Sequence, residues 1–176
     1  MNKSRKIMSI LIILIINVLI SVFNFGNVLN SNTTLLSDYK DIINNNNLFI
    51  IIIVCIMQTI LLLIMVIIDL FLLVVINNII VDNKISMKEN TFKILVVDFL
   101  IVVINFLVLI IIGDYRISTI KLINIIPLSI VIKGILMYFA IYWNRFKSKY
   151  VITVLCTVMI EYLISIGFWL INRIII

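Results

Sequence analysis

The sequence predicts an all-α integral membrane protein, a bundle of five transmembrane helices. Of its 176 residues 64% are hydrophobic and only 12% are charged, an apolar share well above the roughly half that is usual in soluble domains. The charged residues cluster between long apolar runs, and a helix needs about 20 apolar residues to cross a bilayer. Four glycines and one proline favour regular helices over the short alternating segments of a membrane β-barrel. We expect one transmembrane domain over residues 1–176.

Five apolar runs define the expected spans. They cover residues 7–23, 48–76, 94–112, 122–143 and 150–170. A basic segment precedes the first run, as in a signal peptide, but no small-x-small cleavage site follows it, so we expect an uncleaved helix. The second run is longer than a bilayer requires, which predicts tilt or an extension beyond the membrane.

The positions of lysine and arginine predict that the N-terminus lies inside and the C-terminus outside, because basic loops stay cytoplasmic. Nine basic residues fall in the inner segments: Lys3, Arg5, Lys6, Lys84, Lys88, Lys93, Arg145, Lys147 and Lys149. Four fall in the outer segments: Lys40, Arg116, Lys121 and Arg173. Tyr142, Trp143 and Tyr150 stand at the inner boundary, where aromatic side chains are enriched. The net charge of +6 is therefore largely a topology signal, and we expect a lipid bilayer rather than nucleic acid as the partner.

Two of the expected loops are long enough to contain interfacial segments. The outer loop over 24–47 is polar and Asn-rich, and its segment 34–43 is a candidate for a short interfacial helix. Asn32-Thr33-Thr34 matches the glycosylation sequon, which we interpret as a chance match because the Ile-, Lys- and Asn-rich composition is typical of an A+T-rich bacterial genome. The inner loop over 77–93 mixes apolar and charged residues, as interfacial segments do. It is the first candidate for contact with a protein partner, with a plain solvated connector as the alternative.

Polar side chains inside the spans are costly in lipid, so we expect them to face the interior of the bundle. Helical spacing places them along one edge of each helix. Asn17 and Ser21 supply this edge in the first span. In the other spans the expected polar seam consists of Gln58, Asp69, Asp98, Asn105, Ser129, Lys133, Thr157, Glu161 and Ser165.

Depth singles out one pair within this seam. Lys133 and Glu161 each lie eleven residues into their spans, so both are expected near the bilayer centre as an ion pair. Asp69 and Asp98 approach the cytoplasmic ends of their spans, where they would face water, each other or nearby lysines. Two interpretations follow: the ion pair locks the bundle, or the seam forms a path for protons or ions.

The sequence offers no catalytic constellation, and we expect a protein that is not an enzyme. Histidine is absent, which removes the commonest general base and metal ligand. Asp69 and Asp98 lack the Gly-x-Gly-Asp and Tyr-Asp contexts of aspartyl intramembrane proteases. The two cysteines, Cys55 and Cys156, lie inside apolar runs and predict packing rather than a disulfide. No phosphate-binding loop or metal-ligand spacing is present, so we expect no cofactor and no metal.

The chain resembles the Yip family of five-span membrane proteins in three segments. These are Ile67-Ile68-Asp69-Leu70-Phe71-Leu72-Leu73, then Asn90-Thr91-Phe92-Lys93-Ile94-Leu95, then the basic link Tyr142-Trp143-Asn144-Arg145-Phe146-Lys147-Ser148-Lys149-Tyr150. The resemblance covers about half of the chain. It departs from the family pattern over 96–112, which lacks the usual Gly-Tyr and Pro. The resemblance implies a non-enzymatic membrane organiser or adaptor that acts through protein contacts.

Three functional hypotheses remain open from the sequence. The first is this Yip-like adaptor in the cell membrane, acting through a membrane-protein partner. The second is an accessory membrane subunit of a transporter, of the export or bacteriocin-immunity type. The third is a small ion- or proton-coupled carrier that uses Lys133 and Glu161.

Overall fold

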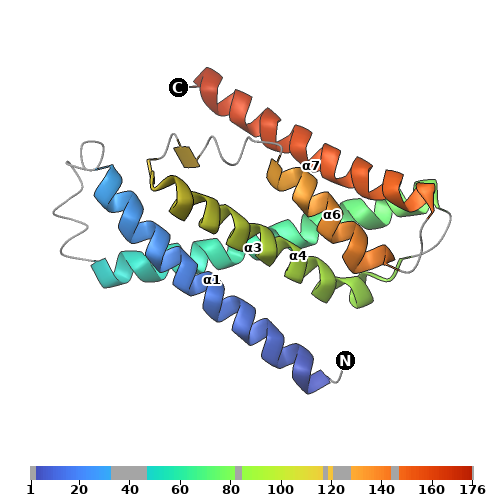
Figure 1. Ribbon diagram of the computed structural model, residues 1–176, viewed down its shortest axis with the longest axis horizontal. Helices are drawn as coiled ribbons and strands as arrows, with labels where there is room; N and C mark the ends of the chain where they lie inside the picture. The colour runs from blue at the N-terminus through green and yellow to red at the C-terminus, as the bar shows by residue number, and fades with distance from the viewer. Residues whose placement is uncertain are drawn as a thin grey trace. The chain divides into compact units, whose positions relative to one another are not determined.

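The computed structural model describes residues 3–32, 47–81, 85–116, 119–120, 128–143 and 147–175. Over these residues the chain is helical and contains no strand, which confirms the predicted all-α class (Figure 1). The helices are α1 (Lys3–Ser31), α3 (Asn47–Ile80), α4 (Met87–Ile112), α6 (Leu128–Tyr142) and α7 (Ser148–Ile175). Among these residues four helices, α1, α3, α4 and α7, are long and apolar enough to cross a membrane. The described part of α6 is shorter, and the predicted start of that span, with Pro127, lies outside the described residues.

The helices extend beyond the predicted apolar runs. α4 begins at Met87 rather than Ile94, and α3 continues to Ile80, so most of the expected interfacial segment over 77–93 is helix. The polar residues there are compatible with a helix start, because Glu89 lies in the first turn of α4, where the helix dipole favours a negative charge. α1 likewise continues to Ser31 into the expected outer loop, whose candidate interfacial helix lies outside the described residues.

Contacts divide the chain into two compact units. Unit 1 comprises Met1–Leu63 and Val102–Ile123, and unit 2 comprises Ile64–Ile101 and Asn124–Ile176. The long helices α3 and α4 each have one part in unit 1 and the other part in unit 2. The expectation of a single transmembrane domain stays a prediction.

In unit 1 the end of α1 packs beside the end of α4. The ring of Phe23 meets the ring of Phe106 edge-on, with centroids 5.5 Å apart, and lies 6.5 Å from the ring of Tyr115. Gly113 ends α4 with a φ of 68°, a backbone conformation that glycine adopts without steric cost. Its amide donates to the Leu109 carbonyl at 2.9 Å.

Asn32 is a packing residue at the end of α1. Its side chain is only 4% exposed, and Nδ2 donates to the Val28 carbonyl at 2.7 Å and to the Tyr115 carbonyl at 3.3 Å. Glycosylation would need this amide nitrogen to be accessible. The structure therefore supports the interpretation that the sequon is a chance match.

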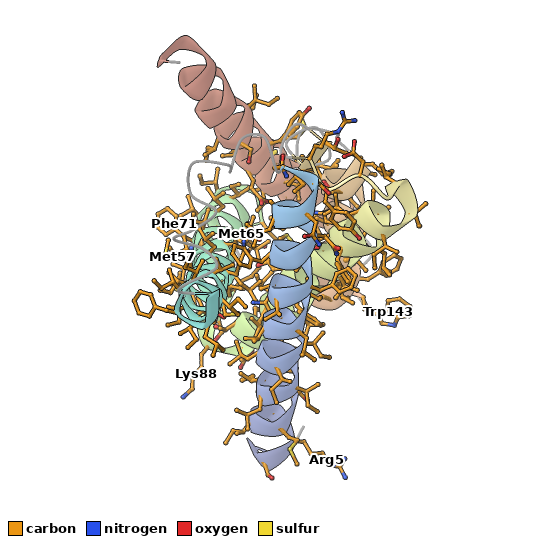
Figure 2. All side chains as sticks on the ribbon, turned by 90° about the vertical axis from the view of Figure 1, so that its left-hand side faces the viewer. Arg5, Met57, Met65, Phe71, Lys88 and Trp143 are labelled. Carbon is orange, nitrogen blue, oxygen red and sulfur yellow. The ribbon has the colours of Figure 1, made fainter. Side chains whose placement is uncertain are left out.

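In unit 2, α6 and α7 lie side by side (Figure 1). They approach closely at Gly134, where an added Cβ would lie 3.8 Å from Val158 Cγ2. The outer surface of α3 is apolar, with Met65 and Phe71 in unit 2 and Met57 in unit 1 all exposed (Figure 2). Exposed apolar side chains in this number suit a surface that lipid covers.

Candidate functional site: a buried charged cluster

Unit 2 places four ionisable residues, one from each of its helices, at a similar depth. Asp69 lies eleven residues before the end of α3, and Asp98 lies eleven residues after the start of α4. Lys133 lies nine residues before the end of α6, and Glu161 lies thirteen residues after the start of α7. At 1.5 Å per residue these separations place all four roughly 14–20 Å from the helix ends. That is near the middle of a hydrocarbon layer about 30 Å thick.

Lys133 is the centre of this charged cluster, which we define as Asp69, Asp98, Lys133 and Glu161. Its Nζ lies 2.5 Å from Asp69 Oδ2, 3.1 Å from Asp98 Oδ1 and 2.6 Å from Glu161 Oε1. The contact with Glu161 is a directed hydrogen bond, so the predicted ion pair is present. One ammonium thus joins α6 to three other helices.

The position of the two aspartates differs from the prediction. We expected them near the cytoplasmic ends of their spans, but Asp69 is 1% and Asp98 is 3% exposed, and both contact Lys133. The error arose because the predicted spans were shorter than the helices: Asp98 lies four residues after the start of the predicted span and eleven residues after the start of α4.

The cluster contains more acceptors than donors. Asp69 Oδ1, Asp98 Oδ2 and Glu161 Oε2 are buried and have no hydrogen-bond donor among the described residues. The carboxyl groups of Asp69, Asp98 and Glu161 all lie within 3.1 Å of the same Nζ, so they are close to one another. Two carboxylates at such a distance cannot both stay ionised in a low-dielectric site, so a proton between them is the favourable arrangement.

The net charge of the cluster also favours bound protons. With every group ionised, one lysine and three carboxylates carry a formal charge of −2, and buried net charge is strongly unfavourable. Neutrality needs two protons on the three carboxyl groups. Binding protons is therefore the chemistry for which this arrangement is suited. Among the described residues no group of three or more His, Cys, Asp or Glu side chains is arranged to hold a metal ion.

An apolar layer covers one side of the charged cluster. One helical turn away, toward the end of unit 2 where α3 and α6 finish, lie Leu73, Ile94 and Met137, each 0% exposed. Thr157 occupies the corresponding position on α7, is also fully buried, and donates to the Thr153 carbonyl of its own helix at 2.8 Å. Its hydroxyl is thereby satisfied without a partner on another helix.

A second polar layer lies beyond the apolar one. Tyr142 Oη donates to Asn77 Oδ1 at 2.8 Å, and the ring of Tyr142 stacks on that of Tyr150 at 4.5 Å. All three residues are buried. Tyr142 and Tyr150, which we expected at the inner boundary as in an aromatic belt, pack between α3, α6 and α7. Trp143 is exposed, as a belt residue would be (Figure 2).

The remaining residues of the predicted seam are distributed more widely. Gln58 is exposed, which corrects its expected inward position: burial of that face of α3 begins one turn later, at Leu62. Asn105 is half-buried in unit 1, and Ser129 is half-buried in unit 2. Ser165 is exposed and donates to the Glu161 carbonyl at 3.0 Å. Of the nine, Asp69, Asp98, Lys133 and Glu161 are brought together from four different helices by their side-chain contacts.

Sequence reasoning missed the bond between Asn77 and Tyr142. The two residues are 65 positions apart, and Asn77 was assigned to a loop. Helical spacing offered no signal for this pair. At 3.6 residues per turn, Asn77 is about 80° around α3 from Asp69, and Tyr142 is on the opposite side of α6 from Lys133.

Comparison with known proteins adds no relative. No protein-family model, curated protein or solved structure matches this chain.

Proposed function

We propose that this chain is a proton-coupled membrane protein in which the charged cluster takes up and gives up a proton. The observation that carries the proposal is the contact of one buried lysine with three carboxyl groups. It corresponds to the third hypothesis from the sequence, a small ion- or proton-coupled carrier, and involves no enzymatic step.

An ion pair that only held the helices together would need fewer residues. Lys133 and one carboxylate make a neutral pair, and a buried pair with satisfied geometry is sufficient to hold helices together. The two further carboxyls increase the negative charge, and in the bilayer interior this is unfavourable unless protons bind. Ionisable residues in such positions commonly belong to proton relays.

The cluster has two accessible charge states close to neutrality. With two protons bound, the four residues are neutral, and with one proton bound they carry −1. Moving between these states transfers one proton and leaves Lys133 charged. A change in the charge of the cluster alters the attraction between α6 and its neighbours, which is the coupling that a carrier requires.

Infrared spectroscopy tests proton binding. The membrane-reconstituted protein at neutral pH should show the carbonyl band of a protonated carboxyl group, and Asp98→Asn should weaken it. Glu89→Gln removes an exposed carboxylate from the same helix and should leave the band unchanged. Absence of the band in the wild type would overturn the proposal.

Proton movement across vesicles tests the function itself. Vesicles that contain a trapped pH-sensitive dye and an imposed potential should acidify faster with the wild-type protein than without protein. Asp98→Asn should return the rate to that of empty vesicles, and Glu89→Gln should keep the wild-type rate. A protonated carboxyl together with a wild-type rate equal to that of empty vesicles would show a static lock and contradict the proposal.

The Yip-like adaptor role and the role of a transporter subunit remain predictions from the sequence. No contact within the described residues favours either over the other.

A further inference from the structure

The three carboxyl groups of the charged cluster are covered unequally. The side chains of Asp69 and Asp98 are 1% and 2% exposed, whereas that of Glu161 is 19% exposed. Glu161 is therefore the member of the cluster that a proton from outside unit 2 reaches first. Its neighbours within the cluster are Lys133 from α6, Asp69 from α3 and Asp98 from α4.

The side chains that lie one helical turn from the cluster also differ between its two sides. Toward one end, the next turn of the four helices supplies Leu73, Ile94, Met137 and Thr157, all 0% exposed. Toward the other end, the next turn of α6 and α7 supplies Ser129, which is half-buried, and Ser165, which is exposed. At the first of these ends the side chains have no exposed surface, whereas the second end is exposed at Ser165 and is open to a proton that approaches Glu161.

We propose that Glu161 is the access residue of the charged cluster, exchanging its proton with the Ser165 end of unit 2, while Leu73, Ile94 and Met137 slow its passage to the Asn77 end. This inference rests on the proposed proton-coupled function and adds the side from which the proton reaches the cluster. In the predicted orientation, α7 begins inside and ends outside, so the Ser165 end faces the outside of the cell.

The roles of the carboxyl groups then separate. Asp69 and Asp98 share one proton in the most buried part of the cluster, where exchange is slow because water is excluded. Glu161 binds the second proton when its carboxylate becomes a carboxylic acid, and Lys133 keeps its contacts with both aspartates. Release reverses the step, so one proton moves and no other bond changes.

Thiol labelling tests the access route in the reconstituted protein. In a Cys55→Ser, Cys156→Ser background, Ser165→Cys is treated with a polar maleimide and proton flux is recorded. The expected result is a loss of flux of at least severalfold on labelling. Phe139→Cys, at an exposed apolar position of α6, is the matched control and should keep its flux after the same treatment.

The barrier is tested by Met137→Ser, which puts a small polar residue into the apolar layer, with Phe139→Ser as its control. Flux should rise severalfold in Met137→Ser, and added Glu161→Gln should abolish the rise. If Met137→Ser does not fold, Met137→Ala replaces it in the test, and its flux should also rise.

The outcomes separate this inference from the proposed function. Wild-type flux equal to that of empty vesicles contradicts the function. If labelled Ser165→Cys and Glu161→Gln both keep the flux of the wild type, the access route is contradicted and the proposed function is not. Unchanged flux in folded Met137→Ser or Met137→Ala contradicts the barrier.

Discussion

The Nζ atom of Lys133 on α6 lies 2.5 Å from Oδ2 of Asp69 on α3, and both side chains are almost fully buried. With Asp98 and Glu161 around the same ammonium, the four helices of unit 2 meet at a single positive charge. Its removal should therefore affect the whole unit.

Lys133→Met should destabilise the protein by about 3 to 5 kcal/mol, the usual cost of removing one partner from a buried ion pair. The carboxyls left behind must bind protons in the folded state and are free to ionise in the unfolded state. The folded state then holds more protons, so stability falls as pH rises. Detergent unfolding at acidic and alkaline pH measures the change. Lys88→Met, which removes an exposed lysine, should have little effect, and a pH-independent loss in Lys133→Met would contradict the reasoning.

A double-mutant cycle between Lys133 and Glu161 should show coupling. Lys133→Ala leaves three carboxyls without a counter-charge, and removing Glu161 as well relieves part of that repulsion. The double variant should be more stable than the sum of the two single losses implies, and more stable than Lys133→Ala alone. Rescue should stay incomplete because Asp69 and Asp98 remain. Additive losses in the unfolding free energy would contradict direct pairing.

Tyr142→Phe should cost about 0.6 kcal/mol, the average for a hydrogen bond between helices in a membrane, and at most about 1.7 kcal/mol. The substitution removes the donor to Asn77 Oδ1 and keeps the ring that stacks on Tyr150. Tyr142→Leu should cost more because it removes the stacking as well. Unfolding in detergent measures both, with Trp143→Phe at an exposed position as the control. Equal losses for the two Tyr142 variants would show that the rings contribute nothing.

Asp114, in the turn after α4, should titrate at unusually low pH. Hydrogen bonds from the Arg116 guanidinium, the Arg116 amide and the Thr119 hydroxyl hold the pKa of this carboxyl below its ordinary value. A depressed folded pKa means that the stabilisation is present above the ordinary aspartate pKa and is lost as pH falls through the folded value. Carboxyl NMR titration measures this pKa, which should rise toward the ordinary value in Arg116→Ala. An unchanged value in that variant would contradict the assigned cause.

The predicted orientation has a direct test. A reporter active only outside the membrane, fused after Ile176, should be active, and the same reporter fused after Lys149 should be inactive. The physical reason is the excess of lysine and arginine in the segments assigned to the inside. The reverse pattern would also reverse the side to which Glu161 is assigned.

The sequence was sufficient for the all-α class and for the pairing of Lys133 with Glu161. Long apolar runs dictate helices because a bilayer leaves no other partner for the backbone. Lys133 and Glu161 sit in the middle of adjacent runs joined by a short connection, so helical geometry alone brings them to the same depth. Placing Asp69 and Asp98 required the true helix ends, which the apolar runs did not mark.

Only the tertiary structure decided that Asp69, Asp98 and Glu161 meet at one lysine, and that Asn77 and Tyr142 pair beyond an apolar layer. Hydropathy specifies which segments leave water, because that depends on each side chain's own transfer free energy. Which helices become neighbours depends on packing between residues distant in the chain, and no local pattern encodes it. The sequence therefore determined a membrane helix protein, and the packing of four helices converted scattered polar residues into a candidate proton site.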